Sequence, residues 1–158
     1  MPSQIQLQAN RQPAIRRRLS KRVPDQYARH DAAAQSLPPN EVFINKYSMV
    51  EIKVRGDQTV ESVQAMGNDA MRLADQLHKA KKRVMILDNL LEIGDVPIEA
   101  STRVAELAKS SNYDKLAMLG SGRLIKIGAN LIFHAAGRAK RMRYFDSRTE
   151  AIRWLLEE

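Results

Sequence analysis

The sequence contains no cysteine and no long apolar run. Without cysteine the chain has no disulfides, no thiolate metal ligands and no thiol nucleophile, which fits a reducing compartment, and we expect the cytoplasm. No apolar stretch approaches the roughly 20 residues that a membrane-spanning helix requires, so we expect a soluble or peripheral protein. The 158 residues suffice for one domain with a real core but not for two large domains.

Residues that could support catalysis or bind a metal are also scarce. The histidines His30, His78 and His134 are scattered, and none has a second ligand at the i+3 or i+4 spacing of zinc sites. We expect His134 to be partly buried among apolar neighbours. Asp88 ends an apolar run, and we expect it to order a loop or cap a helix through nearby backbone N–H groups. The sequence thus predicts no enzyme activity, no metal site and no cofactor.

Positive charge is concentrated at the start of the chain. The formal net charge is +8, and residues 1–40 hold seven Lys or Arg against two acids, whereas residues 41–158 carry only +3. Residues 1–40 lack a sustained apolar period, which predicts a disordered arm. A solvated tail, contact of residues 11–22 with nucleic acid or an anionic surface, and a targeting segment are the interpretations left open. The basic cluster comprises Arg16, Arg17, Arg18, Lys21 and Arg22.

Hydrophobic periodicity predicts that residues 41–158 form one α/β domain with the element order ββαβαβαβα. Alternation up to residue 55 indicates a hairpin whose strands each have one face in water. The apolar run before Asp88 indicates a central strand covered on both faces, because a half-exposed strand would alternate. The expected strands are 41–44, 50–55, 83–88, 116–119 and 142–145, and the expected helices start near Thr59, Pro97, Gly122 and Ser147. We expect Thr59 to cap the first helix, Ile98 to point inward from the second, Gly137 to end the third, and Ser147 and Glu150 to form a capping box at the last.

The third expected helix carries six large apolar residues between positions 124 and 133. This content is typical of a core helix, and we expect the helix to be largely buried over the sheet. The alternative is a loosely packed apolar space beneath it, which would take a lipid or another apolar ligand.

The glycine-rich turn before this helix is a candidate anion site. Such a turn exposes backbone N–H groups at the positive end of a helix, and two cationic side chains follow it. A plain turn in which Ser121 caps the helix is the interpretation that we favour over an anion site. The candidate anion-binding residues are Ser121, Gly122, Arg123 and Lys126.

The end of the chain carries a family resemblance. Residues 144–146 read Tyr-Phe-Asp, and residues 150–155 read Glu-Ala-Ile-Arg-Trp-Leu. Together with the order of elements, these residues resemble the SpoIIAA-like branch of the STAS domains over positions 41–158. The resemblance implies a mixed sheet with helices mainly on one face. It also implies a non-catalytic role in binding partners or small apolar molecules.

The chain departs from the related anti-sigma-factor antagonists at their phosphoacceptor. Those proteins carry a serine directly after an aspartate, at the start of the helix that follows the central strand. Here Asp95 is followed by Val96, which has no hydroxyl group. Ser101 and Thr102 lie a turn further on, and whether either is phosphorylated is left open.

We expect a partner surface at residues 89–98 and the start of the next helix. Apolar residues in a predicted loop are typical of a contact patch, although they could equally fold inward as a lid on the core. The sequence thus favours a regulatory or binding module that acts through protein contact. A nucleic-acid-associated protein and a carrier of a small apolar ligand are the alternatives. The predicted partner-binding residues are Asp88, Leu90, Leu91, Ile93, Asp95, Ser101 and Thr102.

Overall fold

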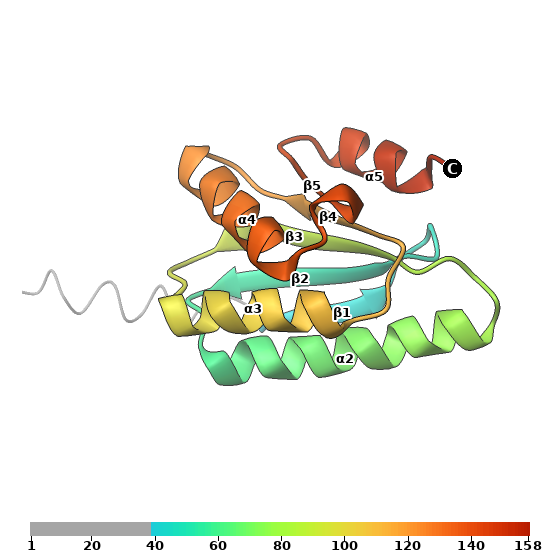
Figure 1. The fold of residues 1–158 in the computed structure, drawn as a ribbon, viewed down its shortest axis with the longest axis horizontal. Helices are drawn as coiled ribbons and strands as arrows, with labels where there is room; N and C mark the ends of the chain where they lie inside the picture. Colours follow the sequence, from blue (N-terminus) through green and yellow to red (C-terminus); the bar gives the residue numbers. More distant parts are fainter. Residues whose placement is uncertain (1–38) are drawn as a thin grey trace, which may run out of the picture.

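A five-stranded mixed sheet forms the centre of the fold (Figure 1). In this computed structural model the described residues are 39–158, so the predictions for the basic cluster at residues 11–22 lie outside them. The strands are β1 (Glu41–Ile44), β2 (Val50–Gly56), β3 (Met85–Ile93), β4 (Lys115–Leu119) and β5 (Met142–Phe145). The helices are α2 (Val60–Lys79), α3 (Ile98–Ser110), α4 (Arg123–Ala136), the short 3₁₀ helix η1 (Ala139–Arg141) and α5 (Arg148–Leu156).

The strands have the same order in the sheet as in the chain. β1 and β2 form an antiparallel hairpin, and β2 to β5 are parallel. Connections between parallel strands are right-handed, so successive crossovers in one direction place their helices on the same face. The crossover helices α2, α3 and α4 pack on one face, and α5, which follows the last strand, covers the other (Figure 1). The predicted element order and the mixed sheet with helices mainly on one face are confirmed.

Each face of the sheet has its own apolar core. Neighbouring residues of β3 point to opposite faces, so Ile86 belongs to the core under α2, α3 and α4, whereas Leu87 belongs to the core under α5. This division explains why the run before Asp88 does not alternate. The fully buried residues of the α5 core include Met49, Leu87, Ala117, Ala151 and Leu155.

Several helix ends follow local sequence signals. Thr59 caps α2 in a capping box with Ser62, as expected for a hydroxyl residue at this position. The Ser147 Oγ accepts a hydrogen bond from the Glu150 N–H at the start of α5. Gly137 ends α4 in the left-handed conformation that glycine adopts readily. The predictions for Thr59 and Gly137 are confirmed, and of the capping box predicted at Ser147 and Glu150 the bond accepted by Ser147 is present.

β3 runs further than the sequence predicts. We expected a loop directly after Asp88, but the strand continues to Ile93. A register shift on β2 between Lys53 and Arg55 lets the pairing resume, with Arg55 opposite Glu92. The apolar residues predicted to lie in that loop, Leu90, Leu91 and Ile93, are therefore strand residues.

α4 is not the largely buried helix that its composition predicts. Leu124 is 83% exposed, Leu131 66% and Ile127 47%, because these three residues form a second apolar row beside the row that packs on the sheet. His134, which we expected to be partly buried, is also exposed. The row that faces the sheet is made of Ile125, Ala129, Ile132 and Phe133.

Two expectations at helix starts are wrong as well. Gly122, with φ of +90°, takes the cap position of α4, so Ser121 does not cap the helix. Ile98, expected to point inward, is 74% exposed because it precedes the packed part of α3, where Ala100 is fully buried.

Glu51 also corrects the prediction for the hairpin, which placed this face of β2 in water. Its side chain is 1% exposed and accepts two hydrogen bonds of 2.8 Å from the Arg148 guanidinium and one of 3.0 Å from the Asn45 amide. Burial alone would raise the pKa of Glu51. The hydrogen bonds from Arg148 and Asn45 outweigh burial, so the pKa lies below its usual value.

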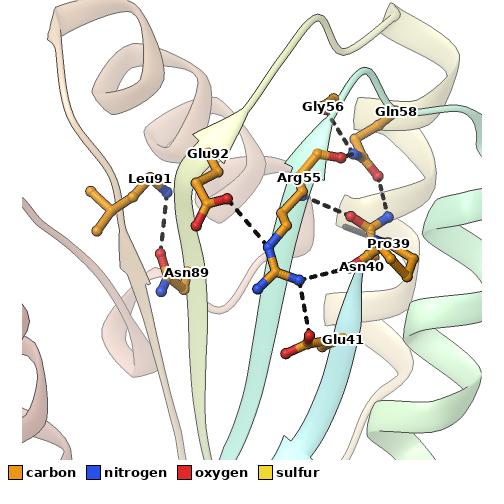
Figure 2. Close-up of polar contacts among 9 residues, drawn as sticks. All are labelled: Pro39, Asn40, Glu41, Arg55, Gly56, Gln58, Asn89, Leu91 and Glu92. Carbon is orange, nitrogen blue, oxygen red and sulfur yellow. Dashed lines mark hydrogen bonds and ion pairs between the residues drawn. The ribbon is translucent and has the colours of Figure 1, made fainter. Parts of the chain in front are cut away.

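Arg55 fastens the first described residues to the sheet (Figure 2). Its guanidinium donates to the Pro39 carbonyl at 2.7 Å and pairs with Glu41 at 3.1 Å, and its backbone N–H donates to the Asn40 side chain. Its Nε also lies 3.3 Å from a carboxylate oxygen of Glu92 on β3. The start of the described chain is thus held against the ends of β2 and β3.

Candidate functional site

An apolar cavity of about 420 Å³ lies between the sheet and helices α2, α3 and α4. Its floor is formed by alternate residues of β2, β3 and β4, and its walls by the inward rows of the three helices. The volume falls within the roughly 300–1,000 Å³ that is typical of small-ligand sites. Apart from apolar residues and glycines, the lining contains Gln58, Asp88, Asp95, Ser101, Ser111 and Tyr113.

Asp88 lies in the floor of this cavity. It occupies the middle of β3, opposite Ile52 on one side and Met118 on the other. Its Oδ1 is shielded from solvent and, among residues 39–158, has no hydrogen-bond partner. Burial raises the pKa of Asp88 to about 7. An unpaired carboxyl group in an apolar wall costs free energy, so its presence needs an explanation.

Tyr113 brings a second unpaired polar group to the lining. The residue is 2% exposed and precedes β4, and its hydroxyl has no partner among the residues that the structure describes. The Arg138 guanidinium lies over its ring, 5.3 Å from the ring centre. By contrast, the amide of Gln58 and the hydroxyl of Ser111 are hydrogen-bonded to backbone carbonyls. The solvent-shielded groups of the lining that lack a hydrogen-bond partner are therefore in Asp88 and Tyr113.

The two ends of the cavity differ in exposure. At the end near the carboxyl termini of the strands, the lining residues Gly94, Asp95 and Leu124 are exposed. At the other end, Tyr113 and Leu116 are buried. The cavity therefore opens beside the β3–α3 connection, at the edge of the sheet where ligands of α/β proteins usually bind.

Glycine is needed at position 94, where the loop after β3 meets the loop after β2 beside this opening. The Gly94 N–H donates to the Gly56 carbonyl at 2.8 Å, and the Asp95 N–H donates to the Asp57 carboxylate at 2.8 Å. A Cβ at Gly94 would lie 2.8 Å from the Gly56 carbonyl carbon, closer than side chains come. These contacts hold the rim of the opening in place.

The predicted partner-binding residues divide into two groups. Asp88, Leu90, Ile93, Asp95 and Ser101 line the cavity. Leu91 is 49% exposed and points away from the Arg55 network (Figure 2), and Thr102 is exposed and donates to the Ile98 carbonyl. Five of the seven residues that the sequence singled out therefore line the cavity, although they were predicted to form a partner surface.

The candidate anion-binding residues lie together at the start of α4. All four are exposed, and within the described chain no side chain caps this helix. No group of three or more potential metal-ligating His, Asp or Glu side chains occurs in residues 39–158. The residues in question are Ser121, Gly122, Arg123 and Lys126.

Sequence reasoning missed the roles of Tyr113 and Gly128. Tyr113 stands in a short polar segment that reads as a turn, and its burial depends on α4, which comes later in the chain. Gly128 lies in the middle of α4, where a Cβ would meet nothing within 4 Å. A glycine inside an otherwise apolar helix was the available signal, because glycine weakens a helix and such a position usually has a packing reason.

Comparison with known proteins agrees with this architecture. A family model described as SpoIIAA-like matches residues 49–156. The chain belongs to the SpoIIAA-like family. A solved structure of an uncharacterised protein with a SpoIIAA-like fold from Shewanella loihica superimposes with a TM-score of 0.57 at 18% identity. The superposition covers 75% of this chain and 95% of that one. None of the curated proteins compared with the chain matches it.

Membership in the SpoIIAA-like family supports a non-enzymatic module at the level of the family, and related STAS domains often bind proteins. Within the described residues, none of the helices combines the length and apolar character needed to cross a membrane.

Proposed function

We propose that this SpoIIAA-like domain is a non-catalytic binding module that holds a small, mostly apolar ligand in the cavity between the sheet and α2, α3 and α4. The observation that carries the proposal is Asp88, whose carboxyl oxygen is shielded and unpaired in the wall of an open apolar cavity. We expect the module to act in the cytoplasm.

Packing alone gives no reason to keep this arrangement. Leaving a buried polar group unpaired costs about 1–3 kcal/mol, and an apolar residue at position 88 would avoid that cost. An unfilled apolar space also sacrifices dispersion contacts along its lining. A bound ligand would restore those contacts and supply a partner for the carboxyl group.

The proposal is tested by filling the cavity from α4. Replacing Gly128 with Leu places a side chain where the structure leaves open space, next to the cavity lining. Asn130→Leu is the matched control, because it adds the same side chain to an exposed position of the same helix. Binding of the neutral, environment-sensitive dye Nile red to the full chain is followed by fluorescence titration.

We expect saturable dye binding to the wild type and to Asn130→Leu, and a loss of at least about tenfold in affinity for Gly128→Leu. Gly128→Leu should fold at least as stably as the wild type, because glycine inside a helix costs about 1 kcal/mol relative to good helix formers. Equal dye binding by all three proteins would show that the cavity is not the binding site.

A second candidate function, contact with a protein partner at the end of β3 and the start of α3, is favoured by exposed apolar side chains. Leu91 is 49% exposed and Ile98 is 74% exposed, although isolated surface leucines need no such explanation. Asp95 lies between them in the sequence and could pair with a cationic group of the partner.

To test this contact, a partner protein is first recovered by its association with the tagged full chain. The partner is then purified, and its affinity for the full chain and its variants is measured by titration. Ile98→Asp places a charge within the proposed surface and should reduce affinity by at least about tenfold, because an unpaired charge is costly in an interface. Ile127→Asp, on the second apolar row of α4, is the control. If Ile98→Asp binds the partner as the wild type does, the contact lies elsewhere.

A further inference from the structure

We propose that the cavity selects an amphiphilic amine, whose ammonium group binds Asp88 while its alkyl chain fills the apolar space. This inference rests on the proposed function, since it assigns a chemical class to the ligand of the same cavity. Three features of the lining carry it: the sign of its charges, the hydrogen bonds that are missing, and its depth.

The charged residues of the lining have one sign. Asp88 lies in the floor and Asp95 at the open end, and among the described residues no lysine, arginine or histidine lines the cavity. An anionic ligand would have to pass one carboxyl group and lie against the other, and the Arg138 guanidinium, which lies over the Tyr113 ring at the closed end, does not line the cavity. Like charges in a poorly solvated site repel strongly, so a fatty acid is the amphiphile that this cavity rejects.

The missing hydrogen bonds define what the ligand must offer. An ionised carboxylate only accepts hydrogen bonds, and an ammonium group only donates them. An ammonium placed at Asp88 would therefore pair with the unpaired Oδ1, and the lining also contains the Ser101 hydroxyl as a potential acceptor. Hydrogen bonds between two charged groups are stronger than those between neutral groups, which favours an amine over an alcohol.

The state of the Asp88 carboxyl is compatible with this pairing. Burial raises its pKa to about 7, so near neutral pH the ionised form is readily accessible. A bound cation would stabilise that form and lower the pKa again. The cavity thus holds a carboxyl group whose ionised form a bound cation would stabilise.

The depth of the cavity sets the length of the apolar chain. Asp88 lies opposite Met118, and Tyr113 at the closed end precedes Met118 by five residues, two of them before β4 begins, which limits the separation along the chain to roughly 16–18 Å. An alkyl chain of about ten carbons is shorter than this limit, and the cavity volume of about 420 Å³ accommodates it. The unpaired Tyr113 hydroxyl would additionally donate to an acceptor at the far end of a ligand that carries one.

The test compares three probes that share one alkyl chain: n-decylamine, n-decanol and decanoate. Each is titrated by calorimetry into the full chain, into Asp88→Asn, and into Asp75→Asn, an exposed aspartate of α2 that serves as the control for loss of one negative charge. Asp88→Glu, which keeps the charge at position 88, is the second variant. Gly128→Leu reports binding outside the cavity.

We expect the amine to bind most tightly and decanoate most weakly. Asp88→Asn should weaken amine binding by about ten- to hundredfold, the loss expected for a charged hydrogen bond, and change decanol binding far less. Asp88→Glu and Asp75→Asn should keep the preference for the amine. The inference is overturned if decanoate binds as tightly as decylamine does, or if Asp88→Asn binds decylamine with the same affinity as the wild type.

Failure of the ligand class is distinguishable from failure of the site. Suppose that Gly128→Leu blocks the binding of Nile red but the protein does not prefer the amine over the other two probes. The cavity then still binds ligands, and only the amine assignment is wrong. If neither the dye nor any of the three probes binds in a manner blocked by Gly128→Leu, both the inference and the proposed function are overturned.

Discussion

Replacing Asp88 with Asn should change how the stability of the protein, measured without added ligand, depends on pH. The pKa of Asp88 is about 7 in the folded protein, compared with 3.8 for an ordinary aspartate. Between these values the folded state holds a proton that the unfolded state has released. The free energy of unfolding of the wild type should therefore fall as the pH rises through this window and level off above about pH 7.

The size of this effect follows from the separation of the two pKa values. Each pKa unit is worth about 1.4 kcal/mol, so the full separation corresponds to an upper limit of roughly 4 kcal/mol. The part that falls between about pH 5 and about pH 8 is roughly 3 kcal/mol. Because the cavity is open at one end, we expect less than this limit, about 1–3 kcal/mol over this range.

Urea unfolding of the wild type, Asp88→Asn and Asp75→Asn at about pH 5 and about pH 8 measures this difference. Asn cannot ionise, so Asp88→Asn should gain stability relative to the wild type on going to the higher pH. Asp75→Asn, at an exposed position, should follow the wild type. The reasoning is refuted if the wild type and Asp88→Asn show the same pH dependence, since Asp88 would then be ionised without cost in the folded state.

Three further predictions concern other parts of the molecule. Glu51→Gln should lower the free energy of unfolding by about 2 kcal/mol or more in thermal or urea unfolding, because it leaves Arg148 without its carboxylate partner. Because the pKa of Glu51 is lowered, this stabilisation should be present above pH 4.5 and fade as the pH falls further, and a difference that persists unchanged in acid would contradict it. Gly94→Ala should destabilise the fold by about 1–3 kcal/mol, since its Cβ would collide with the neighbouring loop, and a variant as stable as the wild type would show that the loops can separate freely. The nucleic-acid interpretation of the basic arm predicts that the full chain binds short duplex DNA in a salt-sensitive manner and that replacing residues 16–18 with Gln removes most of this binding; equal binding by that variant would exclude the arm as the anchor.

The parts of the fold that depend on local signals could be predicted from the sequence. The cap at Thr59, the glycine at position 137 and the apolar run before Asp88 each involve residues within a few positions of one another. The two-sided burial of β3 likewise follows from its lack of alternation.

The parts that were missed depend on residues far apart in the chain. Glu51 alternates with apolar neighbours, a pattern that predicts a solvent-facing residue. Its burial is possible because Arg148, 97 residues later in the chain, donates hydrogen bonds to its carboxylate and offsets the cost of desolvation. The extension of β3 depends on a register shift in β2. The second apolar row of α4 was assigned to the core because composition does not reveal that apolar residues occupy two rows along the helix.

The candidate site shows the same limit. Asp88, Asp95 and Ser101 were singled out from the sequence because they stand at the end of a buried strand and the start of a helix. That they share one cavity, and that Asp88 lacks a partner there, follows only from the packing of α2, α3 and α4 over the sheet.

The identity between strand order and chain order has a consequence for biosynthesis. Each new strand finds its pairing partner already made, so the sheet and the helices on its first face can assemble progressively as the chain leaves the ribosome. The second face cannot be closed in this way, because α5 follows all five strands. Met49, Leu87 and Ala117 therefore stay uncovered until α5 emerges, and during that interval the nascent domain presents a half-finished apolar face to chaperones and to other chains.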